Sequence, residues 1–282
     1  MTTKLLPQPF NCRYARSHMC ARLTVLASGS KGNCAIVASS RTRLLVDAGL
    51  SCRETFKRMA AVGEDPHSLT AILISHEHSD HVAGLPVLAR KLKIPVYMTG
   101  ATNDVWGRQC GRKQTHLDRL ELFASGHSFQ IGDIQVTPFT IPHDAVDPVA
   151  FAFRVDGAKL AVVTDLGYMP ASVRDNVRDS DVLMVESNHD LEMLRVGRYP
   201  WSVKQRVMSR VGHLSNAALA EFFSSDYDGN AAFVVLAHLS EENNHPEIAR
   251  EAAERALAPR RSLLQNRLML ASQWQALEAI RL

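Results

Sequence analysis

The run SHEHSDH, from Ser75 to His81, places three histidines and two acidic residues within seven positions. Several imidazoles and a carboxylate packed together are costly to bury unless a cation orders them, and divalent metals accept both kinds of ligand. On an extended chain His76, His78 and Asp80 point the same way. The adjacent Asp80 and His81 diverge unless the chain turns. The run therefore predicts metal binding, and a tight turn would let the first two histidines hold one ion and the last pair a second.

The elements around this run must position it. Residues 70–75 (TAILIS) predict a buried strand that leads directly into the histidines. Further strands are predicted over 23–28, 34–40, 43–49, 94–100, 182–187 and 231–240, extended chain over most of 121–165, and helices over 51–63, 85–93, parts of 188–225 and 245–258. The strands come in two halves, each followed by helices, which predicts an α+β fold with two mixed sheets packed face to face and helices outside. We expect one domain over residues 21–282, preceded by a disordered extension over residues 1–20.

The composition narrows the classes of protein. The chain has 282 residues, 46% of them hydrophobic and 22% charged, and its net charge of +3 is too small to indicate a nucleic-acid partner by itself. No apolar run approaches the length of a transmembrane helix, and the N-terminus lacks the apolar core of a signal peptide. The five cysteines are odd in number and never spaced as C-x-x-C, which favours reduced thiols. These observations predict a cytoplasmic protein with no membrane partner.

The histidine run resembles the H-x-H-x-D-H signature of the metallo-β-lactamase fold superfamily. Four further motifs match at the ends of predicted strands, at Asp47 (LLVDAG), His143 (TIPHDA), Asp165 (AVVTDLG) and His238 (VVLAHLS). The phrases LASGSKGNC, VESNHD, YPWSVKQRV, GHLSN and HLSEENN are similar to the WalJ/YycJ branch, which is implicated as a DNA exonuclease. The resemblance covers residues 23–248 and implies a four-layer αββα sandwich.

The resemblance also implies a centre of two divalent ions. Its ligands would be His76, His78 and His143 for the first ion, Asp80, His81 and His238 for the second, and Asp165 as the bridge. A hydroxide between the ions would be the nucleophile, with Asp80 and His213 as the catalytic residues. Zinc is the expected metal, and manganese or iron also suit these ligands. Two carboxylates and a hydroxide would balance only part of the positive charge of two divalent ions. The centre would therefore stay cationic and suit an anionic substrate.

Several neighbours of the ligands have supporting roles in this scheme. Asp47 is expected to orient a ligand imidazole from outside the centre, or else to be a turn residue. Glu186 and His189 are expected beside the ligands or facing the substrate. Glu77 and Ser79 alternate away from the ligands and are expected to face solvent or to support the centre.

His213 and the basic block before it concern the substrate. The resemblance implies that His213 stabilises the transition state or protonates the leaving oxygen; the alternative is a histidine in a loop that Ser215 caps. The segment RVGRYPWSVKQRVMSRVGHLSN supplies the candidates for nucleic-acid contact, namely Arg195, Arg198, Tyr199, Trp201, Lys204 and Arg206. Basic groups suit phosphates and aromatic rings can stack on bases. The alternative is an amphipathic helix with a solvated basic face and its aromatic residues in the core.

Three functions remain open at this level. The first is a dimetal phosphodiesterase acting on DNA, an exonuclease that attacks from 5′ ends, where DNA and polarity follow from the resemblance alone. The second is a hydrolase of a small ester, thioester or cyclic phosphodiester. The third is a non-catalytic DNA- or protein-binding module in which metal is only a structural staple; the apparently complete ligand set argues against it. The sequence leaves the oligomeric state open, with a homodimer as one option.

Overall fold

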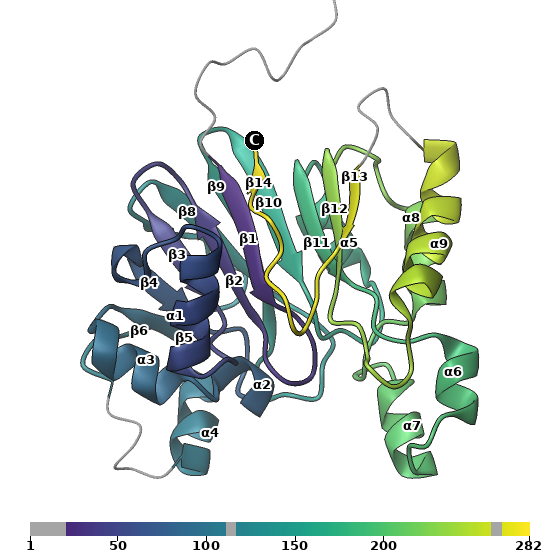
Figure 1. The fold of residues 1–282 in the computed structure, drawn as a ribbon, viewed down its shortest axis with the longest axis horizontal. Helices are drawn as coiled ribbons and strands as arrows, with labels where there is room; N and C mark the ends of the chain where they lie inside the picture. Colours follow the sequence, from purple (N-terminus) through teal and green to yellow (C-terminus); the bar gives the residue numbers. More distant parts are fainter. Residues whose placement is uncertain (1–20, 111–116, 261–266) are drawn as a thin grey trace, which may run out of the picture.

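Two mixed β-sheets face each other at the centre of the molecule (Figure 1). The computed structural model describes residues 21–110, 117–260 and 267–282, so the predicted extension of residues 1–20 lies outside the described residues. The first sheet has the order β14-β1-β2-β3-β4-β5-β6, with β1 (Arg22–Ala27), β2 (Cys34–Ala38), β3 (Arg43–Val46), β4 (Ala71–Leu73), β5 (Val96–Thr99), β6 (Leu120–Phe123) and β14 (Ile280–Arg281). The second has the order β13-β12-β11-β10-β9-β8-β7, with β7 (Phe129–Ile131), β8 (Ile134–Thr140), β9 (Val149–Val155), β10 (Ala158–Val163), β11 (Val182–Glu186), β12 (Phe233–Ala237) and β13 (Arg267–Leu270).

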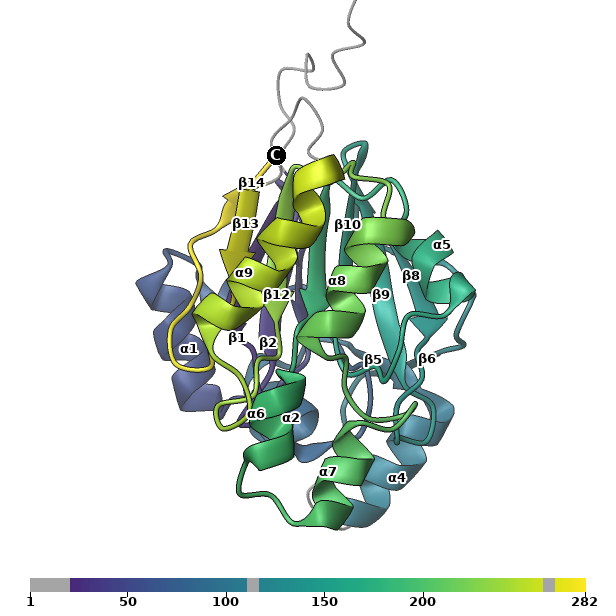
Figure 2. The same cartoon turned by 90° about the vertical axis from the view of Figure 1, so that its right-hand side faces the viewer.

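Helices cover the outer faces of both sheets. They are α1 (Cys52–Ala61), α2 (Ser79–Val82), α3 (Leu85–Leu92), α4 (Gly100–Cys110), α5 (Ala171–Val177), α6 (Leu191–Val196), α7 (Trp201–Val207), α8 (Asn216–Ser225) and α9 (Pro246–Leu257), with 3₁₀ turns at Pro66–Ser68 and Ala258–Arg260. Figure 1 shows α1 and α3 outside the first sheet and α8 and α9 outside the second, and Figure 2 shows α6 and α7 beyond the lower end of the strands. The predicted α+β, four-layer αββα sandwich is confirmed.

The apolar side chains pack in three layers that match this architecture. Val25 and Phe151 belong to the core between the sheets. Phe223 packs with the outer face of the second sheet, and Met59 and Trp106 with the outer face of the first. Because both faces of each sheet are covered, β1, β2 and β11 read as continuous apolar runs rather than alternating ones. Since the two sheets share one core, we infer that residues 21–282 form a single domain.

Helices α4 and α5 and strands β13 and β14 were not predicted from the sequence. The segment of α4, GATNDVWGRQC, contains two glycines and several residues of low helix propensity, so it gives no helical signal. The four residues of β13 and the two of β14 are too short to show a strand period. Strand β13 extends the second sheet and β14 pairs with β1 of the first, so the C-terminal segment crosses from one sheet to the other.

Candidate metal centre

The strands converge on one end of the molecule and carry the candidate ligands there. Strands β3 and β4 are parallel, as are β10, β11 and β12, so their carboxyl ends lie at the same edge of each sheet. Asp47 follows β3, Asp165 follows β10 and His238 follows β12, and each has a positive φ, of 60°, 62° and 54°. Such backbone strain costs roughly 1–3 kcal/mol per residue and is concentrated at functional sites. The chain therefore turns out of each strand at the residue whose side chain enters the site.

The histidine run makes the tight turn that the sequence predicted. It continues from β4 as extended chain, and His78 precedes the single-turn helix α2. The turn closes through a hydrogen bond from the His81 amide to the His78 carbonyl at 2.9 Å. Side chains before and after the turn are thus separated into two groups.

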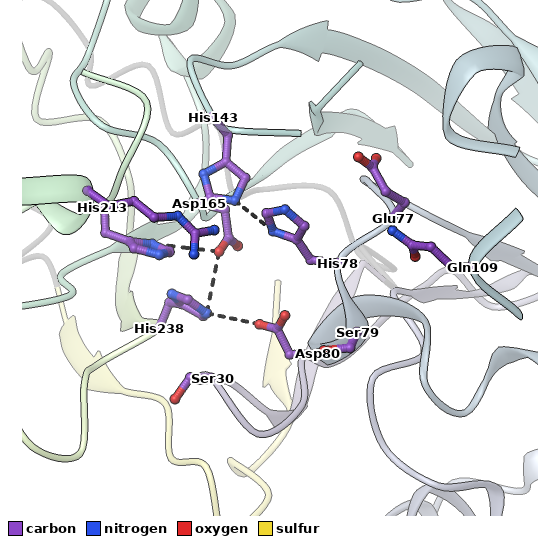
Figure 3. Close-up of a pocket in the computed structure, with 11 residues that line it drawn as sticks. Ser30, Glu77, His78, Ser79, Asp80, Gln109, His143, Asp165, His213 and His238 are labelled. Atoms are coloured by element: carbon purple, nitrogen blue, oxygen red, sulfur yellow. Dashed lines mark hydrogen bonds and ion pairs between the residues drawn. The ribbon is translucent and has the colours of Figure 1, made fainter. Parts of the chain in front are cut away.

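The first group, which we call the trio, consists of His76, His78 and His143. One ring nitrogen from each lies within 4.8 Å of the others, and His143 Nε2 is 3.1 Å from His78 Nδ1 (Figure 3). His143 Nδ1 donates to the Gly212 carbonyl at 3.2 Å, which leaves its Nε2 free to accept or to bind a cation. The Nε2 atom of His76 is buried without a hydrogen-bond partner.

The second group, which we call the quartet, consists of Asp80, His81, Asp165 and His238. Each offers one atom within 4.8 Å of the others. His81 Nε2 is 3.4 Å from Asp80 Oδ2 and 3.3 Å from Asp165 Oδ2, and His238 Nε2 is 3.5 Å from Asp80 Oδ2 and 3.4 Å from Asp165 Oδ1. Oδ2 of Asp165 and Nε2 of His238 are buried and have no hydrogen-bond partner among residues 21–110, 117–260 and 267–282. Unpartnered buried ligand atoms that face one another fit a divalent cation.

Two buried carboxylates contact the quartet imidazoles at Nδ1, the ring nitrogen opposite the candidate ligand atom. Asp47 lies 2.8 Å from His81 Nδ1 and accepts hydrogen bonds from the amide and hydroxyl of Ser75. Glu186 lies 2.9 Å from His238 Nδ1 and 2.8 Å from His213 Nδ1. A carboxylate on the far nitrogen fixes the tautomer and the orientation of a metal-binding imidazole. Asp47 and Glu186 are thus placed where the sequence interpretation put them, beside candidate ligands.

The electrostatics of the quartet favour a positive charge at its centre. Although burial raises the pKa of Asp165, His238 and His81 lower it well below its usual value. Burial lowers the pKa of His81, but Asp47, Asp165 and Asp80 raise it well above its usual value. The pKa of His238 is raised in the same way, by Asp165, Asp80 and Glu186 against the effect of burial. Without metal, protonated imidazoles would neutralise these carboxylates, and a divalent cation would replace those protons.

His213 lies beside the quartet with a different set of contacts. Its ring stacks on that of His238, with centroids 5.1 Å apart and planes at 29°. Its Nδ1 is 2.8 Å from Glu186 and 3.8 Å from Asp165. It also belongs to a third group of possible metal ligands, with Asp165, Glu186 and His238, whose atoms lie within the same 4.8 Å of one another. Because Glu186 occupies its Nδ1, the other ring nitrogen is available to a substrate. Ser215 caps α8 by accepting from the Ala218 amide at 3.1 Å, so the capping loop of the alternative is present, and the catalytic role of His213 stays a prediction.

The trio and the quartet open into one cavity of about 450 Å³. Its lining residues are Ser30, Glu77, His78, Ser79, Asp80, Gln109, His143, Asp165, Arg206, His213 and His238. Figure 3 shows the imidazoles of His78, His143, His213 and His238 around the carboxylates of Asp80 and Asp165. Arg206 brings a permanent positive charge to this wall, and its Nε donates to Asp144.

Of the residues proposed to contact nucleic acid, all except Lys204 are exposed, half-buried or on the cavity wall. Arg206 lines the cavity, Arg198 is exposed, and Trp201 is 63% exposed rather than in the core. Arg195 is exposed and pairs with Glu192 at 2.6 Å. Tyr199 is half-buried. The prediction for Lys204 was wrong, because its side chain is buried and Nζ donates to the Arg195 carbonyl at 2.8 Å.

For two other residues the structure favours one of the alternatives that the sequence left open. His189 is buried, its Nδ1 is 3.4 Å from Asn188 Oδ1, and it is not among the residues that line the cavity. Burial lowers its pKa to about 4, so it does not face substrate as a cation. Glu77 does not point to solvent but is buried and accepts from the Val146 amide at 2.9 Å. It supports the loop that follows His143.

Sequence reasoning also missed residues that contact the quartet. Asn33 places Nδ2 3.1 Å from Asp80 Oδ2, and Asn188 Nδ2 donates to the His238 carbonyl at 2.8 Å. Both lie in phrases, LASGSKGNC and VESNHD, that carried the resemblance, and that was their only signal. An isolated asparagine has no spacing from which a supporting role can be predicted.

Comparison with known proteins agrees with this geometry. Residues 42–238 match the family model described as beta-lactamase superfamily domain. The chain is 40% identical to exodeoxyribonuclease YycJ of Bacillus anthracis over 83% of this chain and 88% of the relative. It is 38% identical to exodeoxyribonuclease WalJ of Streptococcus pneumoniae over 81% of this chain and 85% of the relative. The fold matches that of the metallo-beta-lactamase fold protein YhfI of Bacillus subtilis with a TM-score of 0.69, at 18% identity, over 92% of this chain and 99% of YhfI.

The residues matched by the family model, 42–238, include every candidate ligand. In the described part of the chain, no helix has the length and apolar character needed to cross a membrane. The predicted class of enzyme, a metal-dependent hydrolase, is confirmed, and the chain belongs to the beta-lactamase superfamily, among relatives of the YycJ and WalJ type.

Proposed function

We propose that this chain is a DNA exonuclease that hydrolyses phosphodiester bonds from 5′ ends with two divalent ions. The observation that carries the proposal is the meeting of the trio and the quartet at one cavity, which five of their seven imidazole and carboxylate groups line. The relatives that bear the name exodeoxyribonuclease support DNA as the substrate. The 5′ polarity is part of the proposal and awaits the assay described below.

In this proposal the trio holds one ion, and Asp80, His81 and His238 hold the other, with Asp165 between them. Zinc is the proposed metal, with manganese and iron as alternatives, because selection among them depends on geometry and availability. When bound, two such ions supply a hydroxide nucleophile at neutral pH and offset the charge of a phosphodiester. Asp47 and Glu186 fix the far nitrogens of His81 and His238, which keeps the ligand nitrogens directed inward.

The protein groups on the cavity wall bind and protonate the substrate. Arg206 is placed to pair with a phosphate, and a guanidinium can do so with two hydrogen bonds. His213, held at Nδ1 by Glu186, would give a proton from its other nitrogen to the leaving oxygen. Burial lowers the pKa of His213, but Glu186 raises it above its usual value, which keeps the proton available.

The substrate assay separates this proposal from its alternatives. Purified protein loaded with zinc, manganese or iron is given duplex DNA labelled at either the 5′ or the 3′ end, a chromogenic phosphodiester and a thioester. Release of labelled mononucleotides from the 5′ end first is the expected result. Rapid thioester turnover without DNA degradation would replace the proposal with a small-molecule hydrolase. A folded, metal-loaded protein inert on all of them would indicate a binding module.

We also infer that the protein acts in the cytoplasm. In the described residues Cys34, Cys52 and Cys110 are free thiols, as expected in a reducing compartment. Cys34 is buried, and burial raises the pKa of its thiol well above the usual value, so it is poorly reactive. Mass measurement of the unreduced purified protein, before and after thiol labelling, would test this inference and would also show whether a homodimer forms.

A further inference from the structure

One side chain outside the ligand set touches the quartet directly. Asn33, in the loop between β1 and β2, is buried and places Nδ2 3.1 Å from Asp80 Oδ2 and 3.1 Å from His81 Nε2. Its main chain is tied to the same turn, because the Asn33 amide donates to the Asp80 carbonyl at 2.7 Å. Asn33 is therefore bound to Asp80 through both its side chain and its backbone.

The orientation of the Asn33 amide is determined by its other contacts. Its Oδ1 lies 2.9 Å from the Gly29 amide and 3.3 Å from the Ser28 hydroxyl. A backbone N–H can only donate, so the oxygen must face Gly29 and the NH₂ group must face Asp80. The amide is thus a fixed donor to the Asp80 carboxylate.

This donor selects the position of one carboxylate oxygen. The oxygen that Asn33 contacts, Asp80 Oδ2, is the one that faces His81 Nε2 at 3.4 Å and His238 Nε2 at 3.5 Å. Asp80 keeps 19% of its side chain exposed at the cavity wall, so without the donor it could rotate toward water. Asn33 therefore keeps Oδ2 inside the quartet.

The loop that carries Asn33 is held from the far end of the sequence. Gln273 lies between β13 and β14, is buried, and donates Nε2 to the Gly32 carbonyl at 3.1 Å. Its Oε1 accepts from the Lys31 amide at 2.8 Å. The Gln273 carbonyl accepts from Arg58 Nη1 at 2.8 Å, and the same nitrogen donates to the Leu26 carbonyl at 2.9 Å. Gln273 is thus anchored to α1 and β1 while it binds the loop.

Close packing makes this contact specific. Gly29 and Gly32 both have φ of +147°, a conformation that other residues rarely adopt. A Cβ on Gly29 would lie 2.7 Å from Gln273 Oε1, so another residue at this position would displace the Gln273 side chain from the loop.

We propose that Asn33 is a positioning residue for the quartet ion and that Gln273 holds it in place across the two sheets. The inference rests on the proposed function, because it needs an ion bound between Asp80, His81, Asp165 and His238. Its consequence is that the C-terminal segment, which contributes no ligand, determines how tightly that ion is bound.

Metal affinity tests this inference without reference to activity. The full-length wild type and the variants Asn33→Ala and Gln273→Ala are prepared free of metal and titrated with Co²⁺. The same three proteins are then titrated with the additional substitution His78→Ala, which removes the trio ion so that the remaining bound ion reports on the quartet. Calorimetry gives the affinity, and the visible absorption of Co²⁺ reports the ligand geometry. We expect Asn33→Ala to weaken the quartet ion about 10- to 100-fold and to change its spectrum, as for other residues that support ligands. Gln273→Ala should act several-fold in the same direction.

Controls separate positioning from general damage. Gln275→Ala changes an exposed residue of the same segment and should leave affinity and spectrum unchanged. Thermal unfolding of the metal-free proteins shows whether a variant folds, and Gln273→Ala provides the test if Asn33→Ala does not. If the variants bind two ions with the affinity and the spectrum of the wild type, this inference is overturned but the proposed metal centre is not. A wild type that binds no second ion would overturn the proposed metal centre as well.

Discussion

The trio and the quartet would offer different types of ligand group to a divalent ion. The trio itself offers three imidazoles, and its outer contacts are a hydroxyl, a carbonyl and the Asp144 carboxylate, whose Oδ1 is 3.5 Å from His143 Nε2 and 3.9 Å from His78 Nε2. The quartet offers two carboxylates and two imidazoles, backed by Asp47, Glu186 and Asn33. Attraction between a divalent cation and a buried carboxylate is much stronger than its attraction to a neutral ring. The quartet should therefore bind its ion more tightly and the trio should exchange its ion more readily.

The difference also concerns rigidity. Quartet residues Asp165 and His238 have strained backbones and are nearly fully buried. His78 of the trio is 27% exposed at the cavity wall, and its Nε2 is 3.9 Å from Asp144, which also binds Arg206. The trio thus has the more exposed ligand side chain, since Asp80, the most exposed of the quartet, is 19% exposed.

The largest expected effect comes from Asp165, the proposed bridge between the two halves. Asp165→Ala should reduce hydrolysis on the order of 10³-fold or more, because bridging geometry and charge compensation are lost together. Metal analysis of the dialysed protein should show fewer than two ions, whereas His78→Ala should lose the trio ion and keep the other. Equal retention of both ions in Asp165→Ala would contradict its place between the two halves.

His213 should matter to catalysis without belonging to either half. His213→Ala should slow DNA hydrolysis by about 10²- to 10⁴-fold, the usual range for loss of a general acid. Metal content should stay at the wild-type level, since Glu186 still holds His238. Metal loss that parallels the loss of rate would instead make His213 a ligand.

The carboxylate that orients His81 can be neutralised by a substitution that keeps the size of the side chain. Asp47→Asn keeps the size of the side chain and tolerates the positive φ, but removes the charge opposite His81 Nδ1. We expect affinity for the quartet ion to fall about 10- to 100-fold, measured by competition with a chelating dye. Asp144→Asn, on the trio side, serves as the matched variant and should change metal affinity less, because Asp144 Oδ1 is 3.5 Å from His143 and 3.9 Å from His78, whereas Asp47 is 2.8 Å from His81. The reverse order would remove the distinction between the halves.

The smallest effect concerns substrate binding at the trio side. Arg206→Ala should weaken DNA binding by several-fold and lower the slope of log affinity against log salt by about 1, since one phosphate contact is lost. Lys204→Met is the matched control: its Nζ is buried on a carbonyl, so it should affect stability but leave the salt slope unchanged. Identical slopes for wild type and Arg206→Ala would separate Arg206 from the DNA.

The sequence predicted those parts of the molecule whose signals are local. Apolar runs that end in aspartate or histidine predicted the strands of the two sheets and the candidate ligands. A strand can be recognised from its own residues, and the carboxyl ends of parallel strands lie at the same edge of a sheet. The turn within the histidine run was predicted from the divergence of Asp80 and His81, and helix α2 supplies it.

The remainder depends on contacts between distant segments. The orientation of Lys204 follows from the packing of a short helix, so a basic pattern alone suggested the wrong face. Gln273 meets Lys31 across 242 positions of sequence, and neither residue is unusual in its own neighbourhood. The Asn33 side chain acquires its role only because β1, β2 and the histidine turn meet at one place.

The most direct test of the dimetal centre is a crystal structure grown with manganese or zinc and measured at the absorption edge of the metal. We predict two anomalous peaks roughly 3.5–4 Å apart, one within the trio and one within the quartet, with Asp165 touching both. A single peak, no peak in this cavity, or a peak coordinated by His213 in place of His81 would contradict the account.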